Sequence, residues 1–187
     1  LEMSIQMRSL AEVAGITTNK KCRDAIRKLT EFTGSITKHN ASGVQEKLAA
    51  DYARLFLSIN TIPPHPSESV YREGSLMQSC RDDVMQLYWS FGVDINTEFT
   101  EPEDHIAVEL SFMEFLCQKA VVEIKKGAER EAGRIIQTQN DFLDKHLLKW
   151  VPKLIDDIIV SAKTPFYSSI AVLTGELLNI DAAICRD

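Results

Sequence analysis

The sequence predicts an all-α fold, and three observations carry that prediction. Apolar residues recur at three- and four-residue spacing through most of the chain, as on the buried face of a helix. Glycine and proline interrupt these stretches and leave segments of ordinary helix length. No segment alternates apolar and polar residues like a strand that ends in a turn dipeptide. We expect a single helical domain over residues 1–187, with halves of about 1–99 and 100–187 joined near residues 93–104.

The first half is expected to hold four helices. Three prolines among residues 62–66 set an extended segment between the third and fourth helices, because proline lacks an amide donor and disfavours helical geometry in the preceding residue. Ser42 and Gln45 have the spacing of a capping box, in which two side chains bond the free amides of a helix start. The expected helices cover about 3–13 and 19–36, then a stretch opening at Ser42, and a stretch between Gly74 and Gly92.

The second half is expected to hold four more helices. Pro152 and Pro165 each read as the first turn of a helix, where proline is tolerated, so residues 148–152 are predicted to form a tight corner. The expected helices cover about 102–126 and 128–147, then one following Pro152 and a last one opening at Thr164–Pro165.

Composition excludes several classes of protein. Of the 187 residues, 44% are apolar and 26% are charged, which is ordinary for a globular protein. No apolar run approaches the ~20 residues that span a bilayer, so we expect no stable membrane insertion. The first residues lack the pattern of a secretory signal, and the four cysteines are scattered, which favours a cytoplasmic protein with free thiols. A net charge of −6 disfavours a nucleic-acid partner.

Negative charge is concentrated near the middle of the chain. Residues 94–114 contain seven carboxylates and neither lysine nor arginine. Within this window, Thr100 and Glu103 have capping-box spacing, so carboxylates there are explained in part by the start of a helix. Asp104 and His105 are not explained in this way, and an imidazole that follows three acids is expected to have a raised proton affinity. Such a window would attract a cationic partner.

An enzyme is the first alternative for this segment. Asp104 and His105 could form an acid–base pair or part of the metal site of a hydrolase. However, the other histidines have no metal-ligand spacing to them, and the sequence contains no nucleophile elbow and no phosphate-binding loop. We therefore expect no enzyme activity, no metal and no cofactor. A second alternative is a purely structural helical adaptor, in which the acids only cap a helix.

Five sequence patterns lie along the chain. Residues 52–56 have the pattern Y-x-x-L-F, and residues 66–71 have P-x-E-S-V-Y. Residues 101–113 have E-P-x-D-H-x-x-x-E-L-x-F-M, residues 142–152 have F-L-x-x-H-L-x-x-W-x-P, and residues 162–167 have A-x-T-P-F-Y. In these patterns the chain resembles the TorD/DmsD family of chaperones for molybdenum-cofactor oxidoreductases. The resemblance covers about residues 51–178 in the family's order and spacing.

This resemblance implies an all-helical cytoplasmic chaperone. Its partner would be the precursor of a molybdopterin oxidoreductase, whose twin-arginine signal peptide it binds until the cofactor is inserted and export can proceed. Homodimers that exchange helical halves occur in some members, and weak nucleotide binding has been proposed for some; we predict no nucleotide site here. The resemblance maps recognition onto Asp104 and His105.

Residue chemistry fits this implication. A twin-arginine signal is a cationic stretch followed by an apolar one, and its recognition needs carboxylates for guanidinium groups beside an apolar groove. Aromatic residues of the first half could line such a groove, although aromatic residues most often belong to a core. The predicted peptide-binding residues are Glu101, Pro102, Glu103, Asp104, His105, Tyr71, Tyr88 and Trp89.

Overall fold

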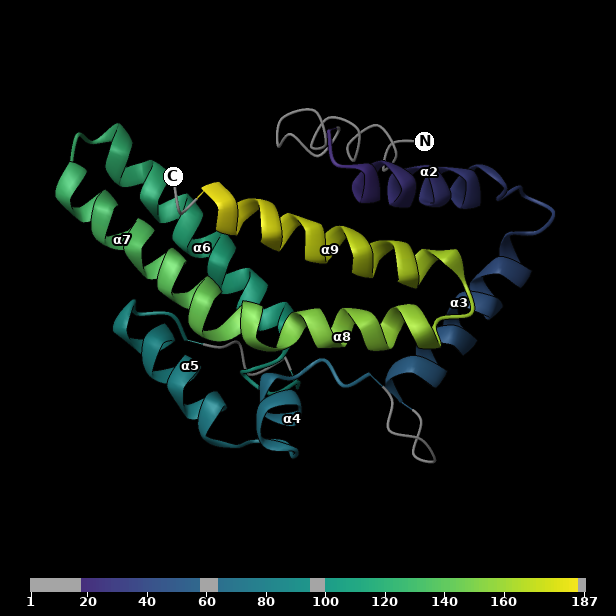
Figure 1. Ribbon diagram of the computed structural model, residues 1–187, viewed down its shortest axis with the longest axis horizontal. Coiled ribbons are helices and arrows are strands. Elements are labelled where there is room, and N and C mark those ends of the chain that lie inside the picture. The colour runs from purple at the N-terminus through teal and green to yellow at the C-terminus, as the bar shows by residue number, and fades with distance from the viewer. Residues whose placement is uncertain (1–17, 58–63, 95–99, 185–187) are drawn as a thin grey trace. The chain divides into compact units, whose positions relative to one another are not determined.

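The computed structural model describes residues 18–57, 64–94 and 100–184 (Figure 1). Every regular element in these ranges is helical, and the one β-type pairing they contain is an isolated bridge. The predicted all-α class is therefore confirmed. The elements are α2 (Lys20–Gly34), α3 (Ala41–Phe56), α4 (Glu68–Glu73), α5 (Ser79–Ser90), α6 (Ile106–Lys125), α7 (Glu129–Phe142), the π-helical η1 (Leu143–Leu147), α8 (Leu148–Ser161) and α9 (Pro165–Ile184).

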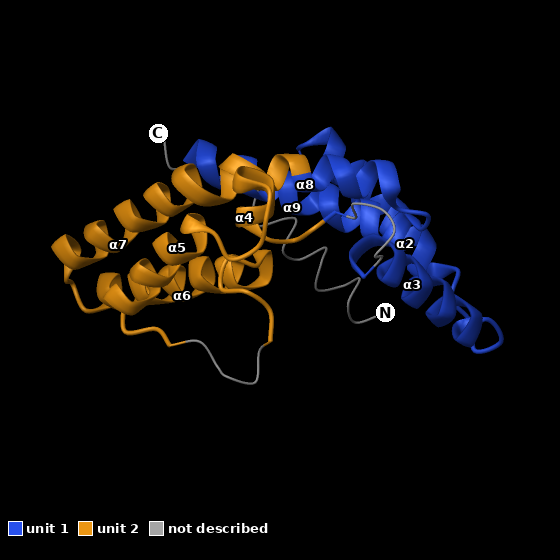
Figure 2. Ribbon diagram, turned by 90° about the horizontal axis from the view of Figure 1, so that it is seen from below, with its two compact units in different colours: residues 1–64, 154–187 blue, residues 65–153 orange. Residues whose placement is uncertain are grey.

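The helices group into two compact units, coloured separately in Figure 2. Unit 1 consists of Leu1–Pro64 and Leu154–Asp187, so its described helices are α2, α3, most of α8, and α9. Unit 2 is His65–Lys153 and holds α4 to η1 and the first turns of α8. The described residues of the segment 93–104, where the sequence placed a junction between two halves, lie within unit 2.

Unit 1 is built on the packing of α2 against α9. Cys22, Ala25 and Leu29 form the buried face of α2 and pack with Leu173 of α9. Asn19 caps α2, because its side chain accepts hydrogen bonds from the amides of Lys21 and Cys22. The apolar face of α2 is thus buried against α9, as expected for an amphipathic helix.

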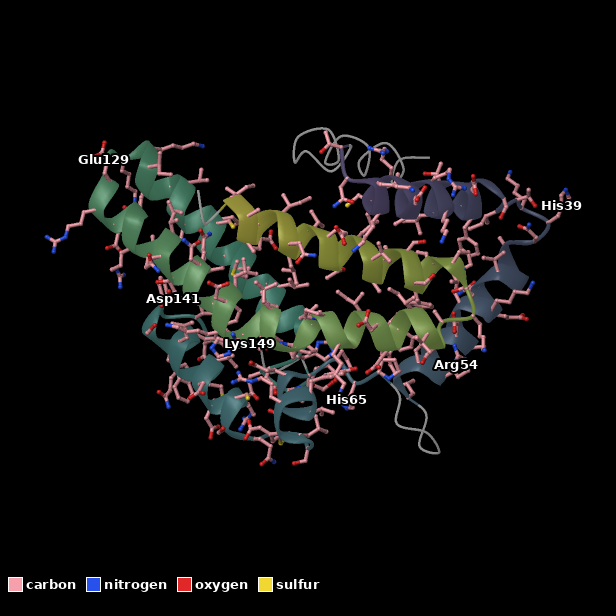
Figure 3. The ribbon with its side chains drawn as sticks, in the orientation of Figure 1. His39, Arg54, His65, Glu129, Asp141 and Lys149 are labelled. Atoms are coloured by element: carbon pink, nitrogen blue, oxygen red, sulfur yellow. The ribbon has the colours of Figure 1, made fainter. Side chains whose placement is uncertain are left out.

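A buried carboxylate, Asp51 of α3, holds the start of α9 in unit 1. Its oxygens accept from the amides of Lys163 and Thr164 at 3.1 and 2.8 Å and from the Thr164 hydroxyl at 2.7 Å. Arg54, labelled in Figure 3, binds both Asp51 and the carbonyl of Ser161 at the end of α8. Burial opposes ionisation of Asp51, but these hydrogen bonds outweigh it and lower its pKa. Asp51 therefore caps α9 from another helix.

Unit 2 has an aromatic core between its helices. The antiparallel pair α6 and α7 packs closely, and α5 lies in the same unit (Figure 2). The Tyr88 ring of α5 lies 4.7 Å from Phe112 of α6 and 6.4 Å from Phe142 of α7, measured between centroids. Buried Val84, Leu116 and Ile135 continue this core. Aromatic packing thus holds α5 against α6 and α7.

Several predicted helix boundaries are wrong. The helix predicted to open at Ser42 begins at Ala41 after Asn40, so Ser42 lies inside it. Pro152 lies inside α8, and residues 142–152 continue without a corner because η1 joins α7 to α8. The short helix α4 was not predicted. The predicted start at Thr164–Pro165 is confirmed by α9. The helix expected over 3–13 lies outside the described residues.

Replacing Asp51 by Asn is expected to lower the free energy of unfolding by about 2–3 kcal/mol, since a buried carboxylate that accepts several hydrogen bonds would be lost. Because the folded pKa of Asp51 lies below its reference value of 3.8, this stabilisation is present at neutral pH and is lost in acid. Urea denaturation measures both effects. Asp24→Asn, an exposed carboxylate on α2, is the control, and equal losses in the two variants would contradict the assignment.

Candidate functional site

Two segments that are distant in sequence lie side by side in unit 2. Ser67 and His105 form the isolated antiparallel bridge. The amide of Ile106 donates to the carbonyl of Pro66 at 2.8 Å, and the amide of Glu68 donates to the carbonyl of Asp104 at 3.0 Å. Proline at 64 and 66 favours the extended geometry that this pairing needs. The predicted motif at 101–105 is thereby fixed against the start of α4.

Asp104 has a structural role inside this pairing. It is fully buried, and its Oδ2 accepts from the amide of Ser69 at 2.7 Å and from the Ser69 hydroxyl. Ser69 stands in the first turn of α4, whose own N-cap residue Ser67 makes no side-chain cap. Asp104 therefore supplies the anionic cap for a helix that lies 35 residues earlier.

His105 is the N-cap of α6. Its Nδ1 accepts from the amide of Ala107 at 3.1 Å, which places the proton of the neutral ring on Nε2. Burial lowers the pKa of His105, and the opposing effect of Glu101 and Asp104 does not overcome it. The expected rise in proton affinity is therefore wrong. The expectation considered only the charges near His105 in sequence, and it did not include the burial of the ring, which removes water from it.

The acids before Asp104 do not form the first turn of α6. That helix begins at Ile106, so the predicted start near Pro102 and the capping box from Thr100 to Glu103 are wrong. Glu103 instead forms a two-point ion pair with Arg81 of α5, in which Nη2 lies 2.9 Å from Oε1. This pairing lowers the pKa of Glu103. The window that lacks bases in sequence is thus partly neutralised by α5, while Glu101 is exposed.

A buried carboxylate cluster, defined here as Glu68, Asp104 and Glu109, lies beneath the motif. All three side chains belong to fully buried residues. Glu68 of α4 accepts from Arg72 Nη1 at 2.5 Å, and its other oxygen lies 2.9 Å from Nδ1 of His146 in η1. The charge of Glu68 is therefore balanced within unit 2.

Glu109 has fewer polar contacts than Glu68. Its Oε2 accepts from the indole Nε1 of Trp150 at 3.1 Å, and its Oε1 has no hydrogen-bond partner. Burial raises the pKa of Glu109 well above 4.5, and the nearby charges of Glu68 and Asp104 raise it further against the effect of the Trp150 bond. Its surroundings therefore favour the protonated form of the Glu109 carboxyl over the carboxylate.

The π-helical segment positions His146 for the cluster. η1 adds an extra residue to the turn between α7 and α8, and the His146 ring stacks on Phe142 at 4.9 Å while it reaches Glu68. The sequence interpretation gave no role to Glu68, Glu109 or His146. A signal existed for Glu109, because it falls on the same helical face as buried Phe112 and Leu116.

The three predicted groove aromatics have different surroundings. Tyr88 is only 1% exposed and belongs to the core, where its hydroxyl donates to the carbonyl of Glu103 at 3.2 Å. Tyr71 is half-buried and packs on Trp150 at 5.8 Å. Trp89 is 58% exposed. Of the three, Trp89 presents most of its ring to solvent.

One face of α5 carries both the Trp89 indole and the carboxylate of Asp82. Asp82, Gln86 and Trp89 follow four- and three-residue spacing, and all three are exposed. We call these residues the α5 face. Arg81 links the face to the motif, since its guanidinium binds Glu103 and also lies 3.7 Å from the Asp82 carboxylate. A carboxylate and an exposed aromatic ring thus share one face of α5.

Other site types find little support in the described ranges. No group of three or more His, Cys, Asp or Glu side chains among those residues is placed to hold a metal ion. The described helices include none that is both long and apolar enough to cross a membrane.

Comparison with known proteins assigns the family. The family model described as "Nitrate reductase delta subunit" matches residues 17–156. "Chaperone protein TorD" of Vibrio parahaemolyticus is 29% identical over 183 residues, which is 96% of this chain and 81% of that protein. The protein of the same name from Photobacterium profundum is 35% identical over 141 residues, or 74% of this chain and 64% of its own length. That from Vibrio cholerae is 28% identical over 170 residues, covering 90% and 75%.

The chain therefore belongs to the TorD/DmsD family of redox-enzyme maturation chaperones, and the predicted resemblance is confirmed. The chaperone names of these relatives agree with the prediction that the protein is not an enzyme.

Glu109→Gln is expected to change how stability depends on pH. Between pH 4.5 and the raised folded pKa, the folded wild type binds one more proton than the unfolded chain, so its stability falls as pH rises by at most about 1.4 kcal/mol per pH unit. Gln stays neutral and still accepts from Trp150, so the variant should lack this slope. Urea denaturation across the range tests it. Glu114→Gln, an exposed site on α6, should retain the wild-type slope, and identical curves for all three proteins would refute the assignment.

Proposed function

We propose that this protein is a cytoplasmic chaperone that binds the twin-arginine signal peptide of a molybdopterin oxidoreductase precursor. It holds the precursor while the cofactor is inserted and delays export until then. Family membership supports the class of partner. The observation that carries the peptide proposal is the juxtaposition of the motif with the α5 face through Arg81.

This juxtaposition has the chemistry that such a peptide requires. The exposed carboxylates Glu101 and Asp82 can accept guanidinium hydrogen bonds in pairs, which gives arginine an advantage over lysine. Trp89 offers a ring on which a guanidinium or an apolar side chain can lie. Glu103 is already paired with Arg81, so an incoming arginine can replace Arg81 there or extend the same ion network.

Buried motif residues have a supporting role in this proposal. Asp104 caps α4 and His105 caps α6, so both hold the backbone on which Glu101, Pro102 and Glu103 are displayed. Tyr88 acts in the same way through the carbonyl of Glu103. Weaker peptide binding in an Asp104 variant is evidence for contact only when its free energy of unfolding is unchanged. Exchange of helical halves between two copies remains a prediction, which the mass of the protein in solution tests.

A peptide with an arginine pair and an apolar stretch is expected to bind at least about tenfold more tightly than its Lys-Lys counterpart, a difference of ~1.4 kcal/mol. The reason is that two planar guanidinium groups can each form paired hydrogen bonds with carboxylates, which ammonium groups cannot. Isothermal titration calorimetry with both peptides measures the ratio. Equal affinities, or no binding for peptides from several candidate oxidoreductases, would count against the proposal.

Trp89→Ala is expected to weaken binding of the arginine peptide by roughly 5- to 30-fold, equivalent to ~1–2 kcal/mol for a lost cation–π contact. Stability should change little, because Trp89 is largely exposed. The matched control is Val122→Ala, an exposed apolar residue on α6 of the same unit, which should bind as the wild type does. Undiminished binding to Trp89→Ala would remove Trp89 from the site and place the peptide elsewhere on the protein.

A further inference from the structure

Glu109 has fewer polar partners than the other two members of the carboxylate cluster. Glu68 has Arg72 and His146 as direct partners, and Asp104 has the amide and hydroxyl of Ser69. Asp104 and Glu109 are both fully buried and each has one oxygen without a hydrogen-bond partner, but Glu109 receives a single indole hydrogen bond where Asp104 receives two from Ser69. A carboxyl in this setting keeps a proton unless positive charge comes near it.

Titratable and charged groups near Glu109 come from several elements of unit 2. Glu68 comes from α4, where it pairs with Arg72, and Asp104 comes from the segment before α6. Tyr88 of α5 lies within electrostatic range of Glu109, Glu68, Asp104 and Glu103 together. His146 of η1 is paired with Glu68, and the neutral indole of Trp150 comes from α8. Among these groups, the cation of fixed charge is Arg72, which is already bound to Glu68.

This cluster is electrostatically connected to the proposed peptide surface. Glu103, which binds Arg81 at the surface, and Asp104, which is buried, are consecutive residues. The charge of Asp104 acts on Arg81 on one side and on Glu109 on the other. A cation added beside Glu103 therefore offsets part of the negative potential that keeps the Glu109 proton in place.

We propose that Glu109 links the protonation of this protein to the binding of a cationic segment. When an arginine-containing segment binds beside Glu103, Glu109 loses its proton to solvent and remains as a carboxylate that accepts from Trp150. Binding and deprotonation favour each other reciprocally, so affinity rises with pH through the titration of Glu109. The inference rests on the proposed peptide function and adds that peptide binding releases a proton from Glu109.

The rise in affinity has an upper limit. One released proton per bound peptide corresponds to at most about a tenfold increase in affinity per pH unit. When the arginines of the precursor leave the site, Glu109 would take up its proton again. Peptide affinity would thus depend on the charge of the partner as well as on its shape.

Calorimetry of the arginine peptide in two buffers with different ionisation enthalpies measures the proton count. The wild type and the control Glu114→Gln should each release up to one proton per peptide. Glu109→Gln should still bind, with no release from this position and with weaker pH dependence. Equal proton release from Glu109→Gln and wild type would overturn the inference.

Infrared difference spectra of the wild type provide a second readout that needs no folded variant. The carbonyl band of a protonated carboxyl group should be present before the peptide is added and should lose intensity on binding. An unchanged band, or no such band before addition, would overturn the linkage. Binding without proton release refutes the linkage alone, whereas absence of peptide binding refutes the proposed function and the linkage together.

Discussion

Unit 2 depends on the burial of three carboxyl groups in a core that has few cations. Burying an unpaired carboxylate is costly, and each member of the cluster avoids that cost differently. Glu68 pairs with Arg72 and His146, Asp104 accepts from the first turn of α4, and burial raises the pKa of Glu109 so that its neutral form is favoured. These solutions fix α4, η1 and the start of α6 relative to one another within the unit. The backbone of the motif is set by the same contacts.

Much of the fold follows from local rules, and the exceptions have identifiable structural features. Pro165 begins α9 and Gly92 follows the end of α5, as proline and glycine chemistry predicts. The start of α6 was misplaced because Glu103 is bound by Arg81, and Asp104 by Ser69, residues of other helices. Pro152 lies inside α8, which follows η1 directly without a corner. Contacts with residues distant in sequence thus decided where α6 begins, whereas the π-helical turn at η1 is a local feature.

The sequence singled out the segment that forms the candidate site but not the structural role of each residue in it. The motif at 101–105 stood out from its composition, and the structure places it at the pairing of two segments. The pKa of His105 was misjudged because neighbouring charges are visible in sequence and burial is not. Glu109 was overlooked because an acid on an apolar helical face was read as part of a charged window. Trp89 and Tyr88 are adjacent in sequence, yet one is exposed and the other forms the core, as successive helical positions require.

An acid–base enzyme requires a carboxylate that orients an imidazole able to exchange a proton with substrate. Here Asp104 directs Oδ2 to Ser69, and His105 uses Nδ1 to accept from the backbone of its own helix. Both groups are therefore engaged in holding secondary structure, and protonation of His105 at Nδ1 would break the cap of α6. A binding role makes no such demand, because buried residues can hold a surface while exposed ones contact the partner. The division between buried Asp104 and Glu109 and exposed Glu101 and Trp89 suits recognition of a charged segment better than catalysis.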